Sequence, residues 1–183
     1  MPAPLSRRTL LAGLGGLGVG ALAGPTFAQA PAGARFRVEV LVFRQPGATP
    51  PAPTVMTLPE AAAPETNPRI QLLPAAEWRF GNLGGALRRS SGYRVLGQGA
   101  WIATVPANGS TTANLAEMLG PGSGVNGAVT VQRGQYLFLR VQVNWPTPEG
   151  GVHQLRERRR VRFDERHYFD HPALGVIAQV SQA

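Results

Sequence analysis

Hydrophobic and polar residues alternate along several segments of this chain, a pattern typical of β-strands with one face in a core. The most regular segment covers residues 35–43 and places four apolar side chains on one face: Phe36, Val38, Val40 and Val42. A second apolar row contains Leu137, Leu139, Val141 and Val143. Weaker strand patterns cover residues 93–96, 100–105, 129–131 and 152–163. We expect these segments to form a mainly antiparallel β-sheet of about five strands.

One segment has the period of a helix rather than of a strand. Leu83, Ala86 and Leu87 fall on one helical face. The two arginines at 88–89 suit the negative end of a helix dipole, and Gly92 can cap the helix. The predicted fold class is therefore α+β, a single domain with one principal helix packed on one face of the sheet.

Turn and loop signals separate these elements. Asn126-Gly127 is a tight-turn dipeptide, and residues 146–151 have the Pro and Gly content of a hairpin loop. Residues 46–74 contain eight prolines and no regular period. This composition predicts a long surface loop.

The first 28 residues have the three zones of an export signal. A basic start with Arg7 and Arg8 precedes an apolar stretch over residues 10–22, and small residues surround a cleavage site after Ala28. The arginine pair favours the twin-arginine route, with the Sec route as the alternative. The apolar stretch is shorter than the ~20 residues of a membrane-spanning helix. We expect cleavage of residues 1–28 and a soluble exported domain over residues 29–183.

Composition and charge narrow the possible functions. The chain has 18 arginines, no lysine, 10 acidic residues and no cysteine. The lack of cysteine excludes disulfides, thiolate metal sites, a catalytic cysteine and lipoprotein anchoring. Loss of the signal would leave 16 arginines against 10 acidic residues, a net charge of +6. An exported protein of this charge meets peptidoglycan, lipid head groups or acidic partner proteins rather than nucleic acid.

The candidate binding residues lie on the predicted strand over residues 152–163. Four arginines occupy alternate positions there, ~7 Å apart on one side of the strand: Arg156, Arg158, Arg160 and Arg162. Such a ridge can bind an anionic ligand or partner. The alternative is an ordinary solvated strand face.

A second group of polar residues follows the ridge. His167 and His171 lie four residues apart with Asp170 between them, a spacing that two zinc ligands could use on a helix. Pro172 argues against a helix at this point. We therefore expect a hydrogen-bonded structural turn, with Asp170 accepting from backbone amides or a neighbouring arginine. His153 has no necessary proximity to this group.

Nucleophilic and glycosidase sites are not expected. Ser123 lacks the first glycine and the preceding strand of a nucleophile elbow. Glu157, Asp164 and Glu165 are interleaved with arginines, so they are better interpreted as ion-pair partners than as a catalytic acid. We expect no catalytic residue, no metal and no other cofactor.

Residues 159–176 closely resemble the C-terminal signature of the CsiV family. In that family a strand with paired arginines leads into Glu-x-His-Tyr, an aromatic residue or leucine, Asp-His-Pro, and an apolar strand containing glycine. Segments 38–44, 93–101 and 127–139 are similar to earlier blocks of the family in the same order. The motif residues, which we expect to be structural, are Arg159, Glu165, His167, Tyr168, Asp170, His171, Pro172 and Gly175.

The resemblance implies a periplasmic protein of Gram-negative bacteria that binds peptidoglycan and supports cell shape. It also implies cooperation with a cell-wall synthase or its lipoprotein activator, without enzymatic activity. Two alternatives remain open on the residues themselves. One is a metal-dependent envelope hydrolase that uses His167, Asp170 and His171, and the other is a periplasmic adaptor that binds only proteins.

Overall fold

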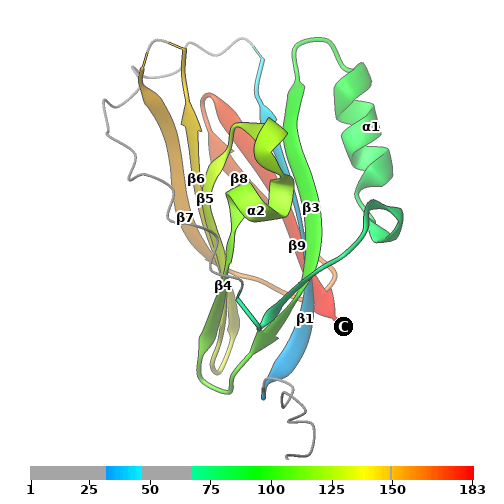
Figure 1. Ribbon diagram of the computed structural model, residues 1–183, viewed down its shortest axis with the longest axis vertical. Coiled ribbons are helices and arrows are strands. Elements are labelled where there is room, and N and C mark those ends of the chain that lie inside the picture. The colour runs from blue at the N-terminus through cyan, green and yellow to red at the C-terminus, as the bar shows by residue number, and fades with distance from the viewer. Residues whose placement is uncertain (1–31, 47–66, 149) are drawn as a thin grey trace, which may run out of the picture. The chain divides into compact units, whose positions relative to one another are not determined.

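The computed structural model describes residues 32–46, 67–148 and 150–183. These residues form two antiparallel sheets (Figure 1). In sheet A the strands run in the order β2 (Ile70–Leu72), β3 (Arg94–Val105), β1 (Ala34–Arg44), β9 (Leu174–Gln182) and β8 (Arg166–His171). Sheet B contains, in order, β4 (Ser110–Asn114), β5 (Asn126–Arg133), β6 (Leu137–Pro146) and β7 (Val152–Arg160). The predicted export signal and residues 47–66 of the proline-rich segment lie outside the described residues.

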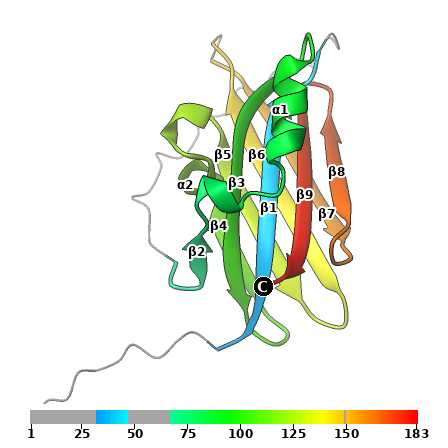
Figure 2. The ribbon, with the colours of Figure 1, turned by 90° about the vertical axis from the view of Figure 1, so that its right-hand side faces the viewer.

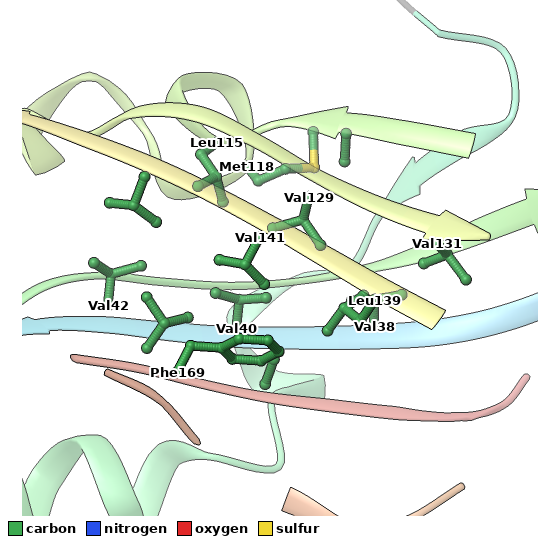
Figure 3. Close-up of a cluster of buried hydrophobic side chains, with 14 of the residues drawn as sticks. Val38, Val40, Val42, Leu115, Met118, Val129, Val131, Leu139, Val141 and Phe169 are labelled. Carbon is green, nitrogen blue, oxygen red and sulfur yellow. The ribbon is translucent and has the colours of Figure 1, made fainter. Parts of the chain in front are cut away.

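The inner faces of the two sheets share one hydrophobic core, as in a β-sandwich. Figure 3 shows the valines of β1 directed toward side chains of β5 and β6. The facing residues include Val38, Val40, Val42, Val129, Leu139 and Val141. The expectation of a single sheet was therefore wrong, although the strands are mainly antiparallel as predicted. The apolar row of residues 137–143 lies opposite the row of β1 instead of extending the same sheet.

The predicted helix exists and packs on the outer face of sheet A. Helix α1 (Gly81–Arg89) lies over this sheet in Figure 2. Its partly buried Leu83 and Leu87 pack against buried Leu41 and Phe43 of β1. Phe80, which precedes the helix, is also buried in this second cluster.

A buried carboxylate determines where α1 begins. Glu39 of β1 is only 2% exposed. Its carboxylate accepts hydrogen bonds from the backbone N–H of Arg79 at 2.9 Å and of Phe80 at 2.7 Å. The side-chain amide of Gln98 donates to the same carboxylate at 3.3 Å. Arg79 and Phe80 immediately precede α1, so Glu39 fixes the start of the helix to β1 and gives the N-cap residue Phe80 an acceptor that the helix lacks.

A second, short helix, α2 (Leu115–Leu119), follows β4 directly. Asn114 caps it by accepting from the backbone N–H of Ala116 at 2.9 Å. Leu115 and Met118 enter the main core between β3 and β5. The 3₁₀ turns η1 (Ala75–Glu77) and η2 (Pro121–Ser123) complete the described elements.

Three local predictions need correction. Residues 70–72, expected in a surface loop, pair with β3 as the edge strand β2. Asn126-Gly127 lies within β5 rather than in a tight turn; Gly127 has a φ of 127°, and a side chain there would collide with the backbone carbonyl of Gln142. The chain around Tyr168 forms strand β8, and its reversal to β9 comes later, at Pro172 and Ala173.

Candidate functional site: the outer face of sheet B

Strand β7 places three of the predicted arginines on the outer face of sheet B. Arg156, Arg158 and Arg160 are exposed and alternate with residues of the inner face. The strand was expected to reach Phe163, but it ends at Arg160. Arg162 therefore lies beyond the strand, where its guanidinium is 3.5 Å from a carboxylate oxygen of Glu165.

Strand β6 adds a fourth arginine that sequence reasoning missed. The β6–β7 register places Arg158 opposite Arg140, with Arg156 opposite Gln142 and Arg160 opposite Phe138. Arg140 is exposed on the same face. A signal was present, because the inward row of residues 137–143 leaves position 140 on the opposite side. We call the surface formed by Arg140, Arg156, Arg158 and Arg160 the basic face.

Beside the basic face, uncharged polar side chains occupy outward positions of β4, β5 and β6. Arg140 lies opposite Thr130, which in turn lies opposite Thr112. The hydroxyl oxygens of the two threonines are 2.8 Å apart. Next to these rows, the side-chain amide of Gln154 donates to the side-chain oxygen of Asn144 at 2.8 Å. The outer face of sheet B therefore passes from hydroxyl and amide groups on β4 and β5 to guanidinium groups on β7.

Aromatic and amide side chains hold two of the guanidinium groups in place. The guanidinium carbon of Arg158 lies 3.7 Å from the ring centroid of Phe138, and its Nη2 donates to Gln132 at 3.2 Å. The guanidinium carbon of Arg160 lies 3.5 Å from the ring centroid of Tyr136. Tyr136 is 42% exposed, so this ring lies on the surface of the protein. These cation–π contacts orient the arginines without neutralising them.

The charges of the basic face are not balanced by acidic residues. In the described strands of sheet B the outward positions hold no aspartate or glutamate. None of the four arginines forms an ion pair within the described ranges. Glu157 lies on the inner side of β7, where its carboxylate binds Arg159. The basic face therefore exposes four positively charged side chains to solvent and to any binding partner.

Arg159 of the family motif connects the two sheets. Besides binding Glu157, it donates from Nη1 to the backbone carbonyl of Tyr168 on β8 at 2.8 Å. Its guanidinium carbon also lies 5.1 Å from the ring centroid of Phe169. These contacts join the edge of sheet B to the edge of sheet A.

The remaining motif residues stabilise the β8–β9 hairpin. The Asp170 carboxylate accepts from the hydroxyl of Tyr168 at 2.9 Å and from the side-chain amide of Gln45. The same amide of Gln45 donates to the backbone carbonyls of His171 at 2.9 Å and Leu174 at 3.2 Å. The partners of Asp170 are thus a tyrosine and a glutamine, where backbone amides or an arginine were expected. Burial, followed by the hydrogen bond from Tyr168 to Asp170, raises the pKa of Tyr168 to about 12.

Gly175 makes room for an aromatic ring. It lies opposite Phe43 in the β1–β9 pairing, and a side chain at position 175 would collide with the ring of Phe43. Phe43 stacks on Tyr168 with ring centroids 6.3 Å apart and meets the ring of Tyr93 at 5.8 Å. The glycine of the motif is therefore explained by packing.

The structure separates the residues of the candidate metal site. Alternation along β8 directs His167 and His171 to the inner side and Asp170 to the outer side. The described residues contain no group of three or more potential metal ligands. His171 instead lies beside His153, with ring centroids 5.8 Å apart. Burial, followed by the proximity of His153, lowers the pKa of His171.

A groove of about 440 Å³ lies at the opposite edge of sheet B. Its lining includes Asn67, Thr112, Asn114, Glu117 and Met118. No arginine lines it, so this groove is distinct from the basic face. Across the described part of the chain, helices long and apolar enough to span a membrane are absent.

Comparison with known protein families identifies a family to which this sequence is similar. The sequence model of a family described as "Peptidoglycan-binding protein, CsiV" matches residues 52–183, which is more than half of the chain and includes β2 through β9. No curated protein matches. No solved structure matches either.

Proposed function

Because the chain belongs to the CsiV family, described as peptidoglycan-binding, we propose that it binds peptidoglycan in the periplasm through the basic face. Its role there is that of a noncatalytic accessory protein of cell-wall synthesis and cell shape. The observation that carries this proposal is the set of four exposed arginines without acidic partners on the outer face of sheet B. Arg162, exposed just beyond β7, follows this set along the chain but is paired with Glu165.

The chemistry of peptidoglycan suits such a surface. The polymer combines amide-bearing sugars with short stem peptides that carry free carboxylates. Guanidinium groups bind carboxylates with two parallel hydrogen bonds, and threonine, asparagine and glutamine side chains exchange hydrogen bonds with amides and hydroxyls. An open sheet also lets a polymer lie across several strands, which an enclosed pocket would not allow.

A noncatalytic role agrees with the arrangement of the polar residues. The inner and outer sides of β8 separate His171 from Asp170, and Glu157 is bound to Arg159. The carboxylate of Asp170 is occupied by Tyr168 and Gln45. These residues contribute to the hairpin and the sheet edge rather than to a reacting site.

Cosedimentation with purified sacculi at low salt tests the proposal. The protein purified from the periplasm after export is expected to pellet with sacculi. A variant with Arg156→Gln, Arg158→Gln and Arg160→Gln is expected to remain in the supernatant. A protein that never pellets with sacculi would overturn the proposed function.

A charge-matched control separates the basic face from general positive charge. The control variant carries Arg88→Gln, Arg89→Gln and Arg94→Gln, three exposed arginines on α1 and at the start of β3. It loses the same charge but leaves sheet B unchanged, so it is expected to pellet like the unmodified protein. Equal loss of binding in both variants would show that net charge, and not this face, carries the interaction.

Binding to a cell-wall synthase or its lipoprotein activator is a second candidate, supported by a separate surface. Tyr93 and Tyr168 are 37% and 41% exposed and flank Phe43 on the outer side of sheet A. Exposed tyrosines are enriched in protein interfaces. A pull-down from envelope extract digested free of peptidoglycan tests this, with a Tyr93→Ser, Tyr168→Ser variant as the comparison. Capture of the synthase or activator by the unmodified protein alone would support it.

A further inference from the structure

Two arginines directly face each other at the centre of the basic face. Arg140 of β6 and Arg158 of β7 are Cα partners in the β6–β7 ladder. Residues paired in this way have Cα atoms only ~4.5–5.5 Å apart, and like charges at such positions destabilise a sheet. In the described part of the chain no acidic side chain lies beside them on this face. The fold therefore does not explain why two cations share this position.

Neighbouring side chains hold one arginine of the pair in place. Arg158 is held by the ring of Phe138 and by Gln132, so its guanidinium is directed before any ligand arrives. Arg156 and Arg160 lie one alternate position to either side, ~7 Å away along β7. Three arginine positions therefore lie in a row along β7, with a fourth position beside the middle one on β6.

We propose that Arg140 and Arg158 form the centre of an anion site that takes the free carboxylates of peptidoglycan stem peptides. This inference rests on the proposed function, because in peptidoglycan the anionic groups are carboxylates rather than phosphates. An anion between the two guanidinium groups offsets their mutual repulsion and accepts charge-assisted hydrogen bonds from both. An extended peptide rises ~3.4 Å per residue, so carboxylates two residues apart match the spacing of the arginines along β7.

In this arrangement the glycan lies against the uncharged part of the outer face of sheet B. Thr112, Thr130, Gln142 and Asn144 carry hydroxyl and amide groups but no charge. Such groups exchange hydrogen bonds with sugars about as well as with water, so they contribute orientation more than affinity. The carboxylates should therefore account for most of the binding free energy.

Soluble ligands test the inference by calorimetry with the exported protein. The three probes are a disaccharide with its stem peptide, the same compound with its carboxylates converted to amides, and glycan chains stripped of peptides by an amidase. We expect the first probe to bind at least about tenfold more tightly than the other two, the equivalent of losing one charged hydrogen-bonded pair. Equal binding of stripped glycan would overturn the inference while binding to sacculi would still support the proposed function.

Variants of the pair identify the site. Arg140→Gln with Arg158→Gln should weaken binding of the first probe at least about tenfold, whereas Arg88→Gln with Arg89→Gln should change it less than about twofold. Arg140→Lys with Arg158→Lys keeps the charge but loses bidentate geometry, so its affinity should fall between those of the unmodified protein and the glutamine variant. Undiminished binding by the glutamine variant would place the carboxylate site elsewhere. Circular dichroism confirms that each variant is folded.

Binding to vesicles of anionic phospholipid is the last measurement. If the first probe does not bind but the vesicles do, and this depends on Arg140 and Arg158, the anion site belongs to a lipid phosphate and the inference fails. Binding of the first probe with no binding of vesicles supports the carboxylate assignment.

Discussion

The outer face of sheet A lies under α1, whereas in the described part of the chain no helix lies over the outer face of sheet B (Figures 1 and 2). Both faces carry charged residues at central positions. On sheet A the central charge is Glu39, which is buried and accepts from the backbone of Arg79 and Phe80. On sheet B the central charges are Arg140 and Arg158, which are exposed and face each other.

This difference separates a charge that serves the fold from charges that, in our proposal, serve a ligand. The carboxylate of Glu39 is satisfied by three donors inside the protein, so nothing remains for an external partner. The guanidinium groups of the basic face have aromatic and amide neighbours but no acid. Substitutions on sheet A should therefore affect stability, and substitutions on sheet B should affect binding.

The largest expected effect on stability comes from Glu39→Ala. The substitution leaves the buried backbone N–H of Phe80 and the partly buried N–H of Arg79 without an acceptor, which should lower the free energy of unfolding by about 2–4 kcal/mol. Urea denaturation measures this. Glu39→Gln keeps one acceptor oxygen and should cost less. A loss below about 1 kcal/mol for the alanine variant would mean that Glu39 does not hold α1 on the sheet.

Gly175→Ala should have the next largest effect. The added methyl group collides with the ring of Phe43, and overpacking of this kind typically costs about 1–3 kcal/mol. Urea denaturation of Gly175→Ala, of Phe43→Leu and of the double variant measures the coupling between the two positions. The double variant should recover part of the loss because the smaller side chain leaves space. Simple additivity of the two substitutions would argue against a direct clash.

Acidification should have a smaller effect through His171. Its pKa in the folded protein lies below the ordinary value of 6.5 because of burial and then His153, while Asp170 acts in the opposite direction. The unfolded chain therefore binds the proton more readily, so this contribution to stability is complete above pH 6.5 and is lost as the pH falls through the lower folded pKa. Urea denaturation at pH 7.5 and 5.5 should show a smaller pH dependence for His171→Gln. An unchanged pH dependence would assign the effect to other groups.

The smallest expected effect on stability is that of Arg140→Gln. Removing one of two facing cations should change the free energy of unfolding by less than about 0.5 kcal/mol, and in the stabilising direction. Thermal and urea denaturation measure this alongside ligand binding. A clear destabilisation would show that Arg140 is part of the fold, and the contrast between the two faces would then no longer hold.

Much of the fold follows from hydrophobic alternation, but the number of sheets does not. The pattern over residues 35–43 predicted that Phe36, Val38, Val40 and Val42 are buried, and the structure confirms all four. Alternation identifies the inner side of a strand but does not reveal which strand lies opposite. The chain could therefore be interpreted as one sheet, whereas the structure contains two.

Strand β8 escaped prediction because its inner face is mostly polar. Of its three inward positions only Phe169 is apolar, and the other two are His167 and His171. A run of this kind has no hydrophobic period, and Pro172 next to it suggested a turn. The contact of His171 with His153 also depends on how the two sheets approach each other, which no local pattern encodes.

The basic face was predicted in part. Alternation placed Arg156, Arg158 and Arg160 on one side of a strand, and the structure has them there. Arg140 was missed because its position opposite Arg158 depends on the β6–β7 register. Hairpin register follows from the geometry of the connecting loop, so the partner of a given residue is difficult to infer from composition alone.

A single hairpin carries all four guanidinium groups of the basic face together with both aromatic rings that hold them. Tyr136, Phe138 and Arg140 come from one arm or the turn before it, and the other three arginines come from the returning arm. The proposed binding surface is thus encoded mainly in one short continuous stretch, residues 136–160, rather than assembled from distant parts of the chain. Such a hairpin can be duplicated, exchanged between related proteins or grafted onto another antiparallel sheet as one unit.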